Sequence, residues 1–239
     1  MIDSTFVKEV ERLALENEVE IISDEGGREY FTGKTFANEP PRPAAMELST
    51  LDGLVDMIVA EELSCSVYIA GPREVGLLGA LDKLWRKREM YAVSRVGKCG
   101  FPFEREMSIE DFIINVQCNF AETPEKKRVI DLVSAITASE VTTAEDDGIA
   151  QEIVTKATIG HKKSKVKLDP IVELRPFRTF REIDQPADKF LIRMHQRGEG
   201  RLPDVSLRSA GGDMWKNEAI QAIYAYLMER VPEGVAVIR

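Results

Sequence analysis

Residues that could carry out acid–base chemistry are few and scattered in this chain of 239 residues. His161 and His195 are the only histidines; His161 falls in a predicted solvated turn, and His195 ends a predicted strand. We interpret each imidazole as an ordinary surface or hydrogen-bonded side chain rather than as a metal ligand or a catalytic base. Three serines that could act as nucleophiles have no evident base in the sequence: Ser94, Ser206 and Ser209.

An acidic run offers a second kind of chemistry. Asp146 and Asp147 precede Gly148, and adjacent carboxylates can bind a divalent cation. The same three residues are typical of a turn, because Asp bonds its own backbone and glycine accepts a positive φ. We interpret the run as a turn. A carboxylate-dependent metal enzyme that uses these two residues and Glu152 stays open as an alternative.

Motifs for nucleotide or thiol sites are missing. The glycines of residues 71–79 are not followed by the Lys-Ser or Lys-Thr pair of a phosphate-binding loop. The helix that follows Gly211 and Gly212 would attract an anion at its start, but we expect Asp213 to cap it and to repel phosphate. The three cysteines are too widely spaced for a CxxC motif: Cys65, Cys99 and Cys118. We therefore predict no catalytic, cofactor-binding or metal-binding residue and no cofactor.

Two basic runs are the candidate interaction residues. The net charge is -9, which disfavours nucleic acid as a partner unless positive charge is concentrated locally. One run contains a tryptophan that could stack on a base, and opposite charge patches could also drive self-association. The candidate residues are Lys83, Trp85, Arg86, Lys87, Arg88, Lys162, Lys163, Lys165 and Lys167.

The elements that position these residues begin with a predicted helix over 2–16 and a hairpin of residues 19–22 and 28–31. Pro40, Pro41 and Pro43 then predict an extended loop. Ser49 or Thr50 can cap a helix whose apolar stripe is Leu51, Leu54, Val55, Ile58 and Val59. The strands predicted next are residues 67–69, 75–78 and 89–96, followed by a glycine-rich loop at 97–103.

The second half changes from helical to strand periodicity. Ser108, which has capping-box spacing to Asp111, and Thr123 are each predicted to cap an amphipathic helix, and Pro124 suits a first helical turn. Alternating residues then predict a hairpin of 141–144 and 149–159 around the acidic turn. The remaining predicted elements are strands at 165–168, 171–175, 190–195 and 204–209, and a C-terminal helix at 214–230.

Segregated strands and helices favour an α+β fold with a mixed, largely antiparallel sheet and a C-terminal helix. We predict an N-terminal region of residues 1–45 and a main α+β region of 46–239, with a sub-boundary near 104–108. Neither a signal peptide nor an apolar run of membrane-spanning length is seen, so we expect a cytoplasmic protein without a membrane partner.

Several stretches together resemble the YfdQ-like family of phage and prophage proteins. They are residues 176–183 (PFRTFREI) with Gln185-Pro186, residues 211–220 (GGDMWKNEAI), residues 146–149 (DDGI) and, less closely, residues 51–56 (LDGLVD). The resemblance covers about 48–230. It implies a phage or prophage origin and residence in the host cytoplasm, and it carries over no activity or catalytic residue.

Three functional hypotheses follow. The first is a non-enzymatic, self-associating homo-oligomer that serves as a binding scaffold or a shell-like assembly. The second is an accessory protein of phage nucleic-acid metabolism that uses the two basic runs. The third is the carboxylate-dependent metal enzyme. We favour the first, because catalytic motifs are missing and charge is segregated along the chain.

Overall fold

The structure is a computed structural model. It describes residues 43–61, 64–82, 86–137, 140–146, 151–156, 163–167, 170–195 and 201–239, together with 20–23, 29–32 and residues 8, 12 and 197. The chain divides into two compact units. One comprises Met1–Ala44 and Leu81–Glu89, and the other comprises Ala45–Ala80 and Met90–Arg239.

The smaller unit contains a two-stranded hairpin. β1 (Glu20–Ser23) and β2 (Glu29–Thr32) pair antiparallel, with Ile21 opposite Phe31 and Ile22 opposite Tyr30. The predicted N-terminal hairpin is therefore confirmed, while its turn lies outside the described residues. The predicted helix over 2–16 also lies outside them, except at Lys8 and Arg12, which are helical.

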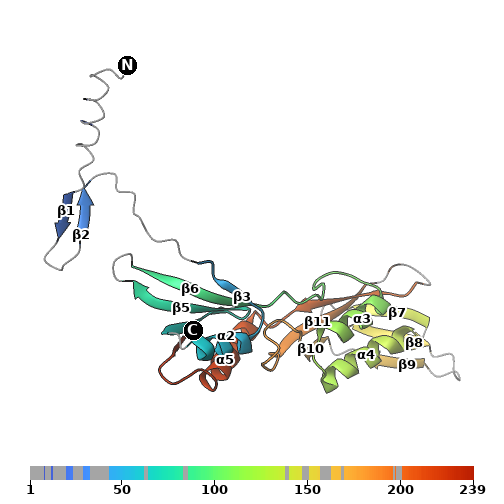
Figure 1. The fold of residues 1–239 in the computed structure, drawn as a ribbon. Coiled ribbons are helices and arrows are strands. Elements are labelled where there is room, and N and C mark those ends of the chain that lie inside the picture. Colours follow the sequence, from blue (N-terminus) through green and yellow to red (C-terminus); the bar gives the residue numbers. More distant parts are fainter. Residues whose placement is uncertain are drawn as a thin grey trace, which may run out of the picture. The chain divides into compact units, whose positions relative to one another are not determined.

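A five-stranded sheet organises the first part of the larger unit (Figure 1). Its strand order is β13-β4-β5-β6-β3. The strands are β3 (Met46–Leu48), β4 (Cys65–Gly71), β5 (Glu74–Asp82), β6 (Lys87–Arg95) and β13 (Ala236–Ile238). β4 and β5 are antiparallel, whereas β13 pairs parallel with β4 and β3 pairs parallel with β6, so the sheet is mixed.

Two helices, α2 (Leu51–Glu61) and α5 (Met214–Met228), cover one face of this sheet (Figure 1). Thr50 caps α2, since its Oγ1 accepts a hydrogen bond from the Gly53 amide at 3.1 Å. Leu51, Leu54 and Ile58 of the predicted stripe are buried and Val55 is partly buried, whereas Val59 is exposed. The core beneath the helices consists of Leu51, Leu54, Ile58, Val67, Ile69, Val75, Leu77, Ala92, Phe180, Ile183, Ile223 and Leu227.

A second core forms between two helices and a three-stranded antiparallel sheet of order β10-β11-β12. The strands are β10 (Ile171–Leu174), β11 (Asp188–His195) and β12 (Asp204–Ser209), and the helices are α3 (Ile109–Asn119) and α4 (Pro124–Thr137). Both predicted caps are confirmed. The Ser108 hydroxyl accepts from the Asp111 amide at 3.1 Å, and the Thr123 hydroxyl accepts from the Lys126 amide at 3.0 Å.

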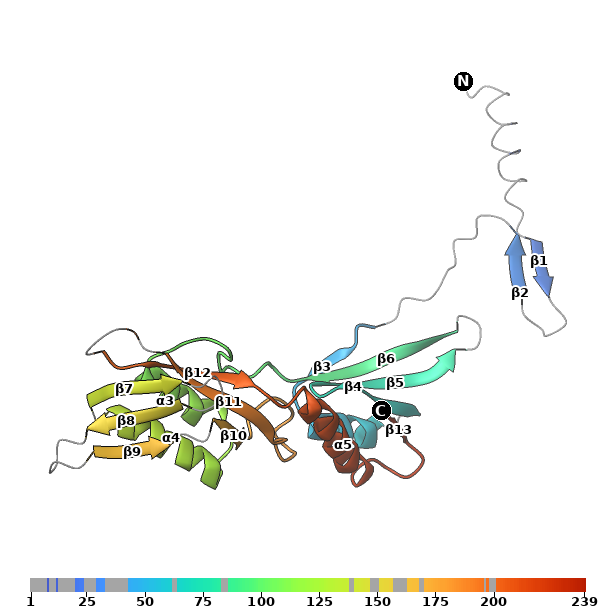
Figure 2. The ribbon, with the colours of Figure 1, turned by 180° about the vertical axis from the view of Figure 1, so that it is seen from behind.

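A third sheet follows α4 in the chain. β7 (Glu140–Asp146), β8 (Gln151–Lys156) and β9 (Lys163–Lys167) form an antiparallel meander (Figure 2). The predicted hairpin is confirmed, although β8 is shorter than the predicted arm. The acidic turn after Asp146 lies outside the described residues.

The α+β class is confirmed, as is the C-terminal helix. Two strands were not predicted, β3 and β13, because each has three residues and exists only through a partner distant in sequence. No helix among the described residues is long and apolar enough to cross a membrane. The domain boundaries at 45 and near 104–108 stay predictions.

Candidate functional sites

A buried arginine joins two of the stretches that carry the family resemblance. The Arg178 guanidinium donates to the Asp188 carboxylate at 2.8 Å, with side-chain exposures of 12% and 2%. It also stands over three aromatic rings, at 5.3 Å from Phe103, 5.0 Å from Phe190 and 4.6 Å from Trp215. Burial lowers the pKa of the guanidinium, and the bond to Asp188 opposes that shift.

The loop around Arg178 contacts both cores. The Gln185 side chain organises it, since its Oε1 accepts from the Arg178 amide at 3.0 Å and its Nε2 donates to the Phe180 carbonyl at 2.8 Å. Phe180 belongs to the core beneath α2 and α5, whereas Phe190 belongs to the core beneath α3 and α4. Glu182 accepts from the Leu51 amide at 2.5 Å, so the loop also caps the start of α2.

The predicted cap at the start of α5 is wrong. Asp213 has a φ of 65°, in the left-handed region, and makes no side-chain hydrogen bond to the helix backbone. A capping residue needs an extended backbone to turn its oxygen toward the free amides. The Asp213 carboxylate instead accepts from Lys216 Nζ at 2.7 Å, and this bond lowers its pKa.

Every polar partner in the Arg178 cluster comes from the chain itself. Among the described residues, no buried side-chain nitrogen or oxygen lacks a hydrogen bond. The cluster therefore offers no unsatisfied group toward a ligand, and its chemistry is that of a structural link between two cores.

The structure provides a base for one of the three serines, which the sequence did not indicate. His195 Nε2 lies 2.9 Å from Ser206 Oγ, and His195 Nδ1 lies 3.3 Å from Glu106 Oε1. This is the order of groups in a hydrolytic triad. However, Ser206 is 0% exposed. A substrate cannot reach its oxygen in this arrangement, which satisfies a buried hydroxyl instead. The other histidine, His161, lies outside the described residues.

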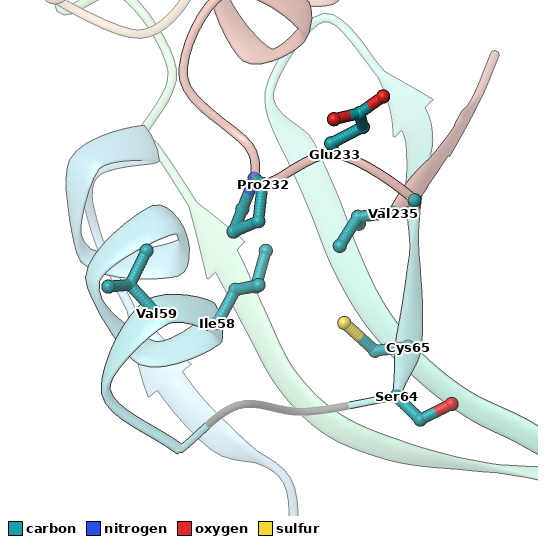
Figure 3. Close-up of a pocket in the computed structure, with 8 residues that line it drawn as sticks. Ile58, Val59, Ser64, Cys65, Pro232, Glu233 and Val235 are labelled. Atoms are coloured by element: carbon teal, nitrogen blue, oxygen red, sulfur yellow. The ribbon is translucent and has the colours of Figure 1, made fainter.

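A surface pocket of about 410 Å³ opens between the end of α2, the start of β4 and the loop before β13 (Figure 3). Ile58, Pro232 and Val235 form its apolar wall, and Cys65 contributes a thiol. Burial raises the pKa of Cys65, which keeps the thiol protonated and a poor nucleophile at neutral pH. Figure 3 shows the Glu233 carboxylate directed away from Ile58 and Cys65, so the one charged side chain among the described lining residues does not face them.

The two predicted basic runs lie on different elements. Lys83, Trp85 and Lys162 lie outside the described residues. Arg86, with a φ of 51°, precedes β6, and exposed Lys87 and Arg88 begin that strand. The other run falls on β9, which contains Lys163, Lys165 and Lys167.

The acidic residues of the third hypothesis are only partly described. Asp146 is opposite Gln151, and Glu145 is opposite Glu152, across β7 and β8. Asp147 lies outside the described residues, and within the described part no group of three His, Cys, Asp or Glu side chains could hold a metal ion.

The face of the five-stranded sheet that α2 and α5 do not cover is a further feature that sequence reasoning missed. Residues opposite one another on paired strands share a face. Ser66 is paired with Leu78 and Ala236, and Tyr68 is paired with Gly76 and Ile238. These two rows alternate with Val67, Ile69, Val75 and Leu77, which face the helices. We call this surface the open face, and it consists of Ser66, Tyr68, Gly76, Leu78, Met90, Ala236 and Ile238.

Met90 belongs to the open face because it lies against Gly76. A Cβ atom built on Gly76 would stand 3.0 Å from Met90 Sδ, so the methionine occupies the space that a side chain would take. Three large members are exposed, Tyr68 at 41%, Met90 at 38% and Ile238 at 47%. None of the seven residues is charged. The sequence does not predict this surface. β4 has apolar residues on both sides, so its sequence does not reveal which side the helices cover.

Comparison with known proteins adds no relative to this description. No family model matches the chain, no curated protein matches it, and no solved structure matches it.

Proposed function

We propose that this chain is a phage- or prophage-encoded protein of the YfdQ-like kind, and that it acts by self-association, as a binding scaffold or part of a shell-like assembly, rather than as an enzyme. The origin rests on the sequence resemblance alone. The observation that supports self-association is the open face, where three large apolar side chains are exposed.

The size of this surface sets the expected strength of association. The open face spans four strands, which are spaced by about 4.8 Å, and two rows of residues across them. With the flanking residues, it covers roughly 300 Å². That matches the largest apolar patches on monomeric proteins, which are often functional. It is well below the roughly 800 Å² per partner of a standard interface. We therefore expect weak association through this face, visible only as protein concentration rises.

Light scattering coupled to size exclusion tests the proposal with the full chain across a wide concentration range. The wild-type mass should rise above 26.8 kDa with concentration. Tyr68→Lys should abolish the rise, because a lysine there would be buried without a partner. Ile114→Lys is the matched control, since Ile114 is 53% exposed on α3, away from the sheet. A monomer at every concentration would overturn the proposal.

One observation supports the second candidate, an accessory role in nucleic-acid metabolism. Three of the five residues of β9 are lysines, Lys163, Lys165 and Lys167, and positive charge concentrated in this way could bind a phosphate backbone. The same lysines are also a common protection of an edge strand against aggregation. Salt-dependent binding of a labelled oligonucleotide that is lost in a Lys163, Lys165 and Lys167 triple glutamate variant would favour this candidate. No binding at low salt would remove it.

A further inference from the structure

Large and small residues alternate between the strands of the open face. In one row the small residues Ala236 and Ser66 lie on β13 and β4, and the large residue Leu78 lies on β5. In the next row the order is reversed, since Ile238 and Tyr68 are large and Gly76 on β5 has no side chain. The strand that carries a large residue in one row therefore carries a small residue in the next row, and the reverse.

We infer that two copies of the chain pack their open faces together about a two-fold axis that runs parallel to the strands, between β4 and β5. This inference rests on the proposed self-association and specifies its geometry. Rotation about this axis places β4 of one copy over β5 of the other and keeps each row over itself. Tyr68 then lies over Gly76 of the second copy, and Leu78 lies over Ser66.

The remaining contacts fit the same arrangement. β13 of one copy lies over β6 of the other, so Ile238 approaches the strand that carries Met90. Met90 must leave the hollow over Gly76 for Tyr68 to enter, and an unbranched thioether side chain can adopt a new rotamer at low cost. Sheets that pack face to face keep their strands within about 30° of each other, which an axis along the strands allows.

Charge around the open face is compatible with a second copy. Glu74 lies on the same side of β5 as Gly76, and Arg95 bonds it at 3.0 Å while standing 3.7 Å from Glu47. The hydrogen bond from Arg95 lowers the pKa of Glu74. The face therefore has an apolar centre with a paired, polar margin, which is the usual anatomy of a protein interface.

Two variants with opposite charges test the contact between Tyr68 and Gly76. Tyr68→Lys and Gly76→Asp should each be monomeric alone, because each places an unpaired charge in the interface. When mixed in equal amounts they should associate, since the lysine of one copy meets the aspartate of the other and the second contact of the pair is wild type. The expected mass is twice 26.8 kDa, and added salt should weaken the mixed pair.

The outcomes separate this geometry from the broader proposal. If the wild type associates and the mixture does not, another occupant covers the open face, for example the β1–β2 hairpin of a second copy, and the two-fold packing is wrong. If the wild type never associates, the proposed function falls as well. Thermal unfolding confirms that each variant is folded, and Ser66→Lys mixed with Leu78→Asp repeats the test if Gly76→Asp does not fold.

Discussion

Arg178 and Asp188 form a buried ion pair that lies where the loop between β10 and β11 meets both cores. The two side chains are joined by a 2.8 Å bond and are almost fully removed from solvent. Removing two charges from water is costly, and the aromatic rings of Phe103, Phe190 and Trp215 supply part of the compensation through their electron-rich faces. The pair is therefore strongly interdependent.

Replacing one partner of this pair should destabilise the protein severely. We expect Arg178→Ala to lower the free energy of unfolding by about 3–5 kcal/mol, because Asp188 would remain buried and uncompensated. Urea denaturation measures the change. The control is Arg128→Ala, which removes an exposed arginine that stands 3.3 Å from Glu125 and should cost less than about 1 kcal/mol. Equal losses in both variants would contradict the assigned role.

The backbone at Gly211 should tolerate no side chain. A Cβ atom there would stand 1.7 Å from Asp188 Oδ1 and 2.9 Å from its Cγ. The carboxylate cannot move aside without losing its bond to Arg178. We therefore expect Gly211→Ala to cost about 2 kcal/mol or more. Gly97→Ala is the matched control, because a Cβ at Gly97 meets nothing within 4 Å. Similar urea midpoints for the two variants would show that the Asp188 side chain repacks freely.

Local features of this fold could be predicted, whereas features that depend on distant partners could not. Ser108 and Thr123 were identified as helix caps because a cap acts within three residues. Asp213 was misassigned because its backbone lies in the left-handed region, with a φ of 65°, which the residue type does not indicate.

The candidate sites show the same division. His195 and Ser206 lie on the neighbouring strands β11 and β12, and the register of these strands brings them together: Arg193 is opposite Ser206, and His195 is opposite Asp204. Glu106 contacts His195 from the loop before α3. No local pattern encodes that register. The basic runs were visible in the sequence as charge alone, and the open face required knowledge of which side of β4 the helices cover.

The free energy of unfolding should decrease at alkaline pH, because Tyr226 titrates there. Burial raises the pKa of Tyr226 to about 12, and the hydrogen bond that its hydroxyl donates to Asp52 makes a smaller contribution in the same direction. The unfolded side chain titrates near 10. The folded protein therefore keeps a proton that the unfolded chain loses between about pH 10 and 12, and this contribution to the free energy of unfolding falls across that window.

The measurement compares the wild type with Tyr226→Phe, which lacks the titrating hydroxyl. Urea midpoints at pH 9 and pH 11.5 should show a larger decrease for the wild type, with other alkaline titrations cancelling in the comparison. Parallel decreases would mean that the hydroxyl titrates at its unfolded pKa and that its bond to Asp52 does not persist in solution.

Lys126 should stabilise the protein by bonding to carbonyl groups at the end of the preceding helix, α3. It is 1% exposed, and its Nζ donates to the carbonyls of Gln117 at 3.1 Å and Phe120 at 3.0 Å and to Glu122 at 2.6 Å. A cation at a helix C-terminus satisfies carbonyls that have no partner within the helix. Lys126→Met keeps the apolar stem but removes the donors, so we expect a loss of about 2–4 kcal/mol. Lys127→Met, at the exposed neighbouring position, should change urea stability by less than about 0.5 kcal/mol. A loss at Lys126 no larger than at Lys127 would show that water replaces the ammonium group at these carbonyls.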